Sequence, residues 1–121
     1  MRVLIFGIFM FSSLLVSTAS FSESQGEQML PFLEGRWSEG ACDKYVEISF
    51  SRPDRSEVTL KYPSGAVRNG QVKFDTNGDI VVFFPVINWT SMVKFKNQDL
   101  YENMDVDKNG KVNNTAYRRC R

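Results

Sequence analysis

The sequence contains no histidine and only two cysteines among its 121 residues. The lack of histidine excludes HExxH zinc sites, Ser-His-Asp triads and Cys-His dyads, and two cysteines are too few for a four-cysteine zinc site. Paired carboxylates with an informative spacing are also missing, because a strand would place Glu34 and Glu39 on opposite faces. We therefore expect a protein that is not an enzyme and that uses no cofactor and no metal ion.

The chain also has almost no net charge, with 15 Lys and Arg against 14 Asp and Glu. The two counts become equal if Arg2 is removed with the N-terminus. Domains that bind nucleic acids usually carry a clear excess of basic residues. We therefore expect no nucleic-acid partner.

Residues 1–19 have the pattern of a secretory signal peptide. Arg2 provides a minimal positive start, residues 3–16 are mostly apolar, and Ser17-Thr18-Ala19 offers a cleavage site of small residues. The apolar stretch is shorter than the ~20 residues that span a bilayer, although an uncleaved membrane anchor is the alternative. We predict a cleaved signal peptide, hence only transient membrane contact and a mature protein that is periplasmic or secreted.

Cys42 and Cys120 are expected to form a disulfide in such an oxidising compartment, rather than two free thiols. Their separation of 78 positions encloses most of the mature chain. In the chain-entropy description, a loop of this length restricts the unfolded state by about 4–5 kcal/mol. The bond also requires the beginning and the end of the fold to be neighbours.

Residues 20–34 are polar and then mildly apolar, and Pro31 ends any helix. We predict a polar leader here, with at most one helical turn around residues 27–30. From Gly35 onward, turn residues recur at regular intervals. The strongest hairpin signals are three Asn-Gly pairs, because both central positions of a type I′ turn need positive φ. These pairs are Asn69-Gly70, Asn77-Gly78 and Asn109-Gly110.

The segments between the turns alternate apolar and polar residues, as half-buried strands do. The run of residues 80–87 is apolar almost throughout, and we expect it to be the most buried strand, with a bulge or bend at Pro85. The predicted strands cover residues 35–39, 43–51, 56–62, 66–75, 79–87, 89–97, 99–104 and 111–120.

Eight short strands joined by tight turns must bury an apolar face, and closing the sheet into a barrel does so while removing exposed edges. We predict an all-β domain over residues 35–121, a small antiparallel eight-stranded up-and-down barrel whose first and last strands pair. An open sheet or a two-sheet sandwich is the alternative. A barrel of eight strands is either filled by side chains or holds one small ligand.

The tripeptide Gly35-Arg36-Trp37 opens the first predicted strand and resembles the Gly-x-Trp signature of lipocalins and the wider calycin group of small ligand-binding barrels. The resemblance implies that the tryptophan closes one end of the barrel beneath an arginine from near the C-terminus. The candidates for this arginine are Arg118, Arg119 and Arg121, and we predict that it is Arg119. Biotin binding, known from the related avidins, is not expected, because residues 38–41 replace the polar residues that it needs.

The leading functional prediction is a non-catalytic, lipocalin-like barrel that encloses a small apolar ligand. Binding pockets are largely apolar and aromatic, although the same side chains would also serve as plain core. The candidate ligand-binding residues are Trp37, Tyr62, Phe84, Trp89 and Phe95.

The alternative is a periplasmic protein-binding module that uses turns at one barrel end, such as a lysozyme or protease inhibitor or a toxin immunity protein. Residues 63–66 resemble the Ser-Gly loop of periplasmic lysozyme inhibitors, which makes Ser64, Gly65 and Arg68 the loop candidates. A plain tight turn is the simpler interpretation of this segment.

Residues 105–110 match the first half of an EF-hand calcium loop, with oxygen ligands at positions 1, 3 and 5 and a glycine at position 6. Position 12 of the loop would be Ala116, where the bidentate glutamate belongs. We therefore predict a charged hairpin turn without a metal.

Overall fold

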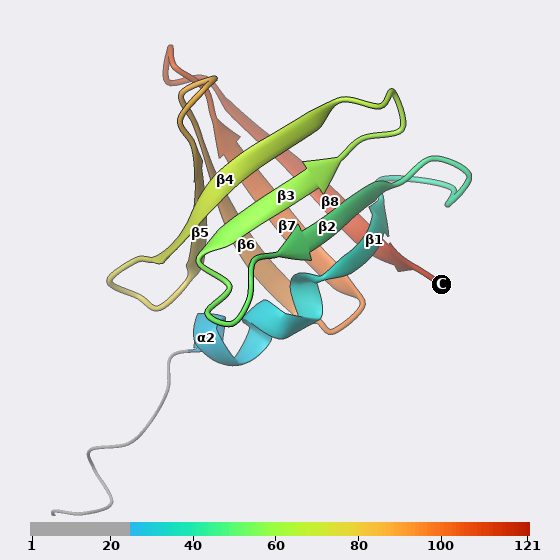
Figure 1. The fold of residues 1–121 in the computed structure, drawn as a ribbon, viewed down its shortest axis with the longest axis horizontal. Helices are drawn as coiled ribbons and strands as arrows, with labels where there is room; N and C mark the ends of the chain where they lie inside the picture. Colours follow the sequence, from blue (N-terminus) through green and yellow to red (C-terminus); the bar gives the residue numbers. More distant parts are fainter. Residues whose placement is uncertain (1–24) are drawn as a thin grey trace, which may run out of the picture.

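The computed structural model describes residues 25–121, so the predicted signal peptide lies outside the described residues. Eight antiparallel strands follow one another in chain order and close into a barrel (Figure 1). They are β1 Gly35–Ser38, β2 Val46–Phe50, β3 Glu57–Lys61, β4 Val67–Phe74, β5 Ile80–Phe84, β6 Trp89–Asn97, β7 Leu100–Val106 and β8 Val112–Cys120. The predicted eight-stranded up-and-down barrel is therefore confirmed, and the open sheet and the sandwich are excluded.

The alternation of side chains along the strands builds the core inside the barrel. In β2, Val46, Ile48 and Phe50 are buried, as their period of two predicts. Burial of apolar surface is the main favourable contribution to folding. The buried apolar cluster consists of Leu30, Leu33, Trp37, Val46, Ile48, Phe50, Val58, Ile80, Val82, Phe84, Val93 and Tyr101.

The barrel closes where β1 pairs with β8, with Arg36 opposite Cys120 and Trp37 opposite Arg119. This seam is short, because β1 has only four residues. The Cys42–Cys120 disulfide joins the β1–β2 loop to the end of β8, with Cα atoms 5.7 Å apart. The predicted disulfide is thus confirmed, and it lies beside the closing seam.

Two short helices close one end of the barrel, α2 (Gln25–Met29) and the 3₁₀ helix η1 (Leu30–Leu33). Leu30 and Leu33 are buried in the core, because residues three apart lie on one side of a 3₁₀ helix. The prediction of at most one helical turn is therefore wrong, because residues 25–33 are helical throughout and pack against the barrel. Pro31 does not end the helix, since it lies in the first turn of η1, where its missing N–H is not needed. None of the helices in residues 25–121 has the length and apolar character needed to cross a membrane.

Helix α2 is held against the β4–β5 turn through a close backbone approach. The N–H of Gly26 donates a hydrogen bond to the carbonyl oxygen of Gly78 over 3.0 Å. A Cβ atom at position 26 would lie 2.2 Å from that oxygen. The docking of α2 therefore requires glycine at this position.

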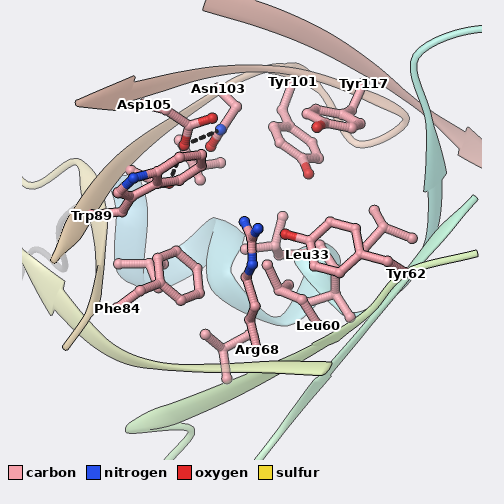
Figure 2. A pocket seen from close by; sticks show the side chains of 16 residues that line it. Leu33, Leu60, Tyr62, Arg68, Phe84, Trp89, Tyr101, Asn103, Asp105 and Tyr117 are labelled. Atoms are coloured by element: carbon pink, nitrogen blue, oxygen red, sulfur yellow. Dashed lines mark hydrogen bonds between the residues drawn. The ribbon is translucent and has the colours of Figure 1, made fainter. Parts of the chain in front are cut away.

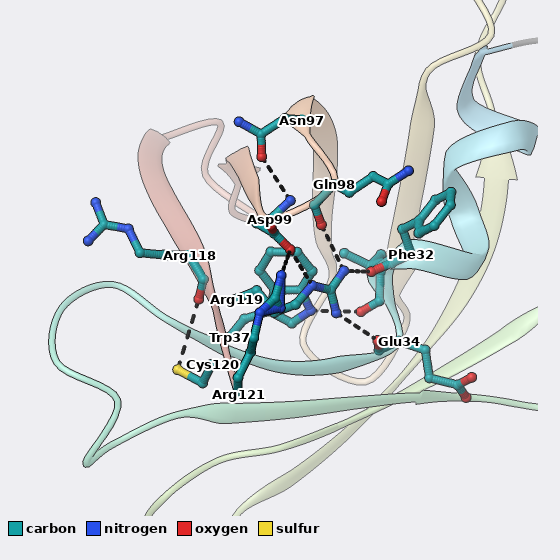
Figure 3. A network of polar contacts seen from close by, with 11 residues as sticks. Phe32, Glu34, Trp37, Asn97, Gln98, Asp99, Arg118, Arg119, Cys120 and Arg121 are labelled. Carbon is teal, nitrogen blue, oxygen red and sulfur yellow. Dashed lines mark hydrogen bonds and ion pairs between the residues drawn. The ribbon is translucent and has the colours of Figure 1, made fainter.

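Trp37 is fully buried (0% exposed) at the closed end. Its indole N–H donates to the carbonyl oxygen of Leu33 over 2.8 Å, and the guanidinium of Arg119 lies 4.4 Å from its ring centre. Arg119 is therefore the arginine that covers the tryptophan. It also donates hydrogen bonds to the carbonyl oxygens of Phe32, Glu34 and Gln98 and to the carboxylate of Asp99 (Figure 3).

The Asn-Gly pairs divide into two hairpin turns and one strand segment. Asn77-Gly78 and Asn109-Gly110 lie in the β4–β5 and β7–β8 turns, each with a glycine φ of 80°. The prediction of a turn is wrong for Asn69-Gly70, which lies inside β4. A Cβ atom at Gly70 would approach Val82 to 2.7 Å and Phe84 to 2.9 Å, so this glycine is required for packing inside the barrel.

The strand predicted over residues 79–87 is shorter than expected. β5 ends at Phe84, and residues 85–88 form the turn to β6, in which Asn88 has a φ of 53°. Pro85 has no N–H to donate to a strand ladder. The chain therefore leaves the sheet at the proline instead of bulging and continuing.

We expect the double variant Cys42→Ser/Cys120→Ser to unfold with a free energy about 3–5 kcal/mol below that of the oxidised parent, because the unfolded chain gains freedom. Urea denaturation with and without reductant measures this. Reductant should lower the stability of the parent to that of the variant and leave the variant unchanged. A parent whose unfolding midpoint does not respond to reduction would contradict the role of the disulfide.

We also expect Gly70→Ala to lower the free energy of unfolding by about 1–3 kcal/mol, because the added methyl group overpacks the barrel against Val82 and Phe84. Gly40→Ala is the matched control, since a Cβ atom there meets nothing within 4 Å, and its effect should stay within about 0.5 kcal/mol. Equal unfolding midpoints for the two variants would show that Gly70 is not held by packing.

Candidate functional site

The barrel interior contains a cavity that opens to solvent at the end opposite the helices (Figure 2). Its volume is ≈ 70 Å³, whereas sites for drug-sized ligands usually measure about 300–1,000 Å³. Side chains therefore fill most of the interior. The apolar walls are formed by Leu33, Val46, Ile48, Val58, Leu60, Val82, Phe84 and Val93.

Polar and aromatic side chains gather at the mouth of this cavity. Tyr62 follows the end of β3, Arg68 is the second residue of β4, Trp89 begins β6, and Asp105 lies near the end of β7. These positions meet because an up-and-down barrel places the β3–β4, β5–β6 and β7–β8 turns at the same end. The mouth is thus assembled from segments far apart in the sequence.

Arg68 projects into the centre of the cavity (Figure 2). Its guanidinium carbon lies 5.0 Å from the ring centre of Tyr62 and 5.0 Å from that of Trp89. The two cation–π contacts offset part of the cost of removing the charge from water. Within residues 25–121, no carboxylate lies within ion-pair distance of this guanidinium. The mouth therefore holds a half-buried cation without a counter-ion from the described chain.

Asp105 is the acidic group of the cavity. Its Oδ1 accepts hydrogen bonds from the hydroxyl of Ser91 and from the side-chain amide of Asn103, the latter over 2.8 Å. Hydrogen bonds to a charged acceptor are stronger than those between neutral groups. These two donors therefore hold the carboxylate in place without an ion pair.

Three tyrosines line the cavity, and Tyr101 is the most buried of them, 4% exposed with its ring centre 4.7 Å from that of Trp37. The rings of Tyr101 and Tyr117 stack with centres 5.2 Å apart and an interplanar angle of 22°. Burial raises the pKa of the Tyr62, Tyr101 and Tyr117 hydroxyls, and it raises the pKa of Tyr117 to about 12, with the nearby carboxylates of Glu39 and Asp105 adding to the shift. All three hydroxyls therefore remain protonated at neutral pH and can donate hydrogen bonds.

Tyr62, Phe84 and Trp89, three of the five predicted ligand-binding residues, line the cavity. Trp37 and Phe95 lie instead toward the closed end, where their ring centres are 6.2 Å apart. The structure thus brings the first three together at one site and places the other two beside the helices. Ligand contact by the cavity-lining residues stays a prediction.

The predicted loop candidates separate in the same way. Ser64 and Gly65 lie in the exposed β3–β4 turn, where Gly65 has a φ of 89°. Arg68 belongs to β4 and points inward, opposite Leu60 of β3. The period of two could have found this orientation, since Arg68 shares a strand face with Gly70 and Val72.

The EF-hand-like segment forms a hairpin turn. The Oδ1 atom of Asp107 accepts hydrogen bonds from the backbone N–H groups of Asn109 and Lys111, each over 2.9 Å. The carboxylate thereby stabilises the turn between β7 and β8. In the part of the chain that the structure describes, no group of three or more His, Cys, Asp or Glu residues is placed to hold a metal ion.

The raised pKa of Tyr117 predicts a loss of stability at high pH. Between the ordinary tyrosine pKa of about 10 and the folded value of about 12, the folded protein keeps the proton and the unfolded chain releases it. The free energy of unfolding therefore falls as the pH rises through this window. Tyr117→Phe should reduce this fall, measured as the difference between urea unfolding at pH 8 and at pH 11. An identical fall in parent and variant would contradict the assignment.

Comparisons of the chain with protein-family models, with curated proteins and with solved structures find no match. The closed eight-stranded barrel is compatible with a lipocalin-like fold. A proposal about function therefore rests on the residues and geometry of the cavity.

Proposed function

We propose that the protein is a non-catalytic, lipocalin-like binding protein of the periplasm or the extracellular space, which takes a small ligand into the mouth of its barrel. The observation that carries this proposal is the solvent-open cavity with apolar walls and a few convergent polar groups. Small-molecule sites typically combine these two features. The disulfide supports an oxidising compartment.

The size of the cavity sets the kind of ligand. A volume of ≈ 70 Å³ accommodates a small molecule or one end of a longer one. An apolar body placed against Phe84 and Trp89 would gain about 25 cal/mol for each Å² of apolar surface removed from water. The remainder of a longer ligand would lie between the turns that surround the mouth.

Native mass spectrometry of the protein purified from its own host tests this proposal. We expect a retained small molecule in the parent and its loss in Val58→Phe, because the larger ring fills the cavity from β3. Val67→Phe is the matched control, since this valine is 54% exposed and does not line the cavity. Circular dichroism establishes that each variant is folded. A folded Val58→Phe protein that retains the molecule, or a parent that retains none, would overturn the proposal.

One further feature favours a second candidate, a protein-binding module that acts through the same barrel end. Val86 is 95% exposed in the β5–β6 turn, and Val112 is 51% exposed at the start of β8. Exposed apolar side chains on the rim of a rigid barrel are suited to contact a partner such as a lysozyme, a protease or a toxin. A host protein that co-purifies with the parent and is lost in Val86→Ser would support this candidate.

A further inference from the structure

We propose that the mouth of the barrel binds the carboxylate group of a monoanionic ligand through Arg68. This inference rests on the proposed function and specifies its ligand class, a small organic acid or the acid end of a longer amphipathic molecule. The apolar body of the ligand would lie against the rings and aliphatic side chains that line the cavity.

The geometry of Arg68 favours recognition through the edge of its guanidinium. The rings of Tyr62 and Trp89 both lie 5.0 Å from the guanidinium carbon (Figure 2). Contacts with ring faces hold the planar group in position, and the hydroxyl of Tyr62 also interacts with the guanidinium. The remaining N–H donors lie at its edge. A carboxylate matches these donors with two parallel hydrogen bonds.

Arg68 lies in the cavity without a counter-ion from the described chain. Within residues 25–121, Arg36, Arg52, Arg119 and Arg121 each form an ion pair with a carboxylate. Arg55, Arg68 and Arg118 form none, and of these three only Arg68 lines the cavity. A partly buried charge without a partner is costly. An anionic ligand would supply the missing partner.

The cavity wall opposite Arg68 carries hydroxyl groups that can donate hydrogen bonds to a carboxylate. Figure 2 shows Tyr101 and Tyr117 extending from the wall across from Arg68. Their hydroxyls make no hydrogen bond within residues 25–121 and are protonated at neutral pH. They can therefore donate to a ligand oxygen that Arg68 does not reach.

The cavity favours a monoanion over a more highly charged group. The carboxylate of Asp105 lines this cavity and adds to the upward pKa shifts of Tyr62 and Tyr117, so its field reaches the mouth. A phosphate dianion would feel the attraction of Arg68 and the repulsion of Asp105 in equal proportion, and it would lose much more hydration than a carboxylate on entering the cavity. A carboxylate is also small enough to approach Arg68 within a cavity of ≈ 70 Å³.

Isothermal titration calorimetry with benzoate, hexanoate and decanoate tests this inference. Each acid is compared with its neutral amide, and inorganic phosphate is titrated separately. We expect at least one acid to bind about tenfold or more tightly than its amide, because charged hydrogen bonds contribute more than neutral ones. Phosphate should bind more weakly than that acid.

Arg68→Met should remove the preference for the acid over the amide, and Arg68→Lys should retain part of it, because lysine keeps the charge but loses the planar pair of donors. Arg118→Met is the matched control, since Arg118 is exposed on β8 and does not line the cavity, and it should bind as the parent does. The Arg68→Lys variant keeps the test decisive should Arg68→Met fail to fold.

Each outcome separates the carboxylate inference from the proposed function. Equal binding of acids and amides, tighter binding of phosphate, or unchanged acid binding in both Arg68 variants would overturn the carboxylate inference alone. A neutral molecule retained in native mass spectrometry would do the same and leave the proposed function intact. Failure of all three acids to bind at millimolar concentration overturns the carboxylate inference, and a parent without any retained molecule removes the proposed function as well.

Discussion

The pairing of β1 with β8 is the constraint on which the rest of the structure depends. Only three of the four residues of β1 pair with β8, and the Cys42–Cys120 disulfide and the contacts of Arg119 reinforce this seam from two sides. An unclosed sheet would expose both edge strands and admit water to the core. The cavity exists only because this seam keeps the eight strands in a ring.

Two arginines lie against tryptophans at opposite ends of the barrel, and their surroundings give them opposite roles. Arg119 covers Trp37, and its donors are used by backbone carbonyls and by Asp99. Arg68 lies against Trp89 with no carboxylate partner in the described chain. Arg119 therefore holds the closed end together, whereas the N–H donors of Arg68 at the open end remain available to the proposed anionic ligand.

The sequence predicts the architecture well because strand alternation, turn residues and cysteine spacing are local or compositional signals. The sequence-based prediction fails at positions whose residue type depends on tertiary packing. Asn69-Gly70 has the composition of a turn, but glycine is needed at position 70 because the ring of Phe84 leaves no room for a Cβ atom. Leu30 and Leu33 escape notice because the apolar run of residues 29–33 is short and contains Pro31, so that it shows no period. The residues at the cavity mouth are harder to predict, since the neighbours of Arg68 come from separate strands and their proximity depends on the register of the barrel. Aromatic character predicts Trp37 and Phe95 to line the ligand site, but this property does not distinguish the two ends of a barrel.

The two short helices α2 and η1 cover one end of the barrel (Figure 1). In the part of the chain that the structure describes, the cavity then opens at the end away from the helices, so a ligand held there would leave by the route through which it entered. Entry and exit would both pass between the β3–β4, β5–β6 and β7–β8 turns. Stiffer turns would lower the association rate and the dissociation rate of a ligand alike, so that the kinetics of binding would change more than the affinity.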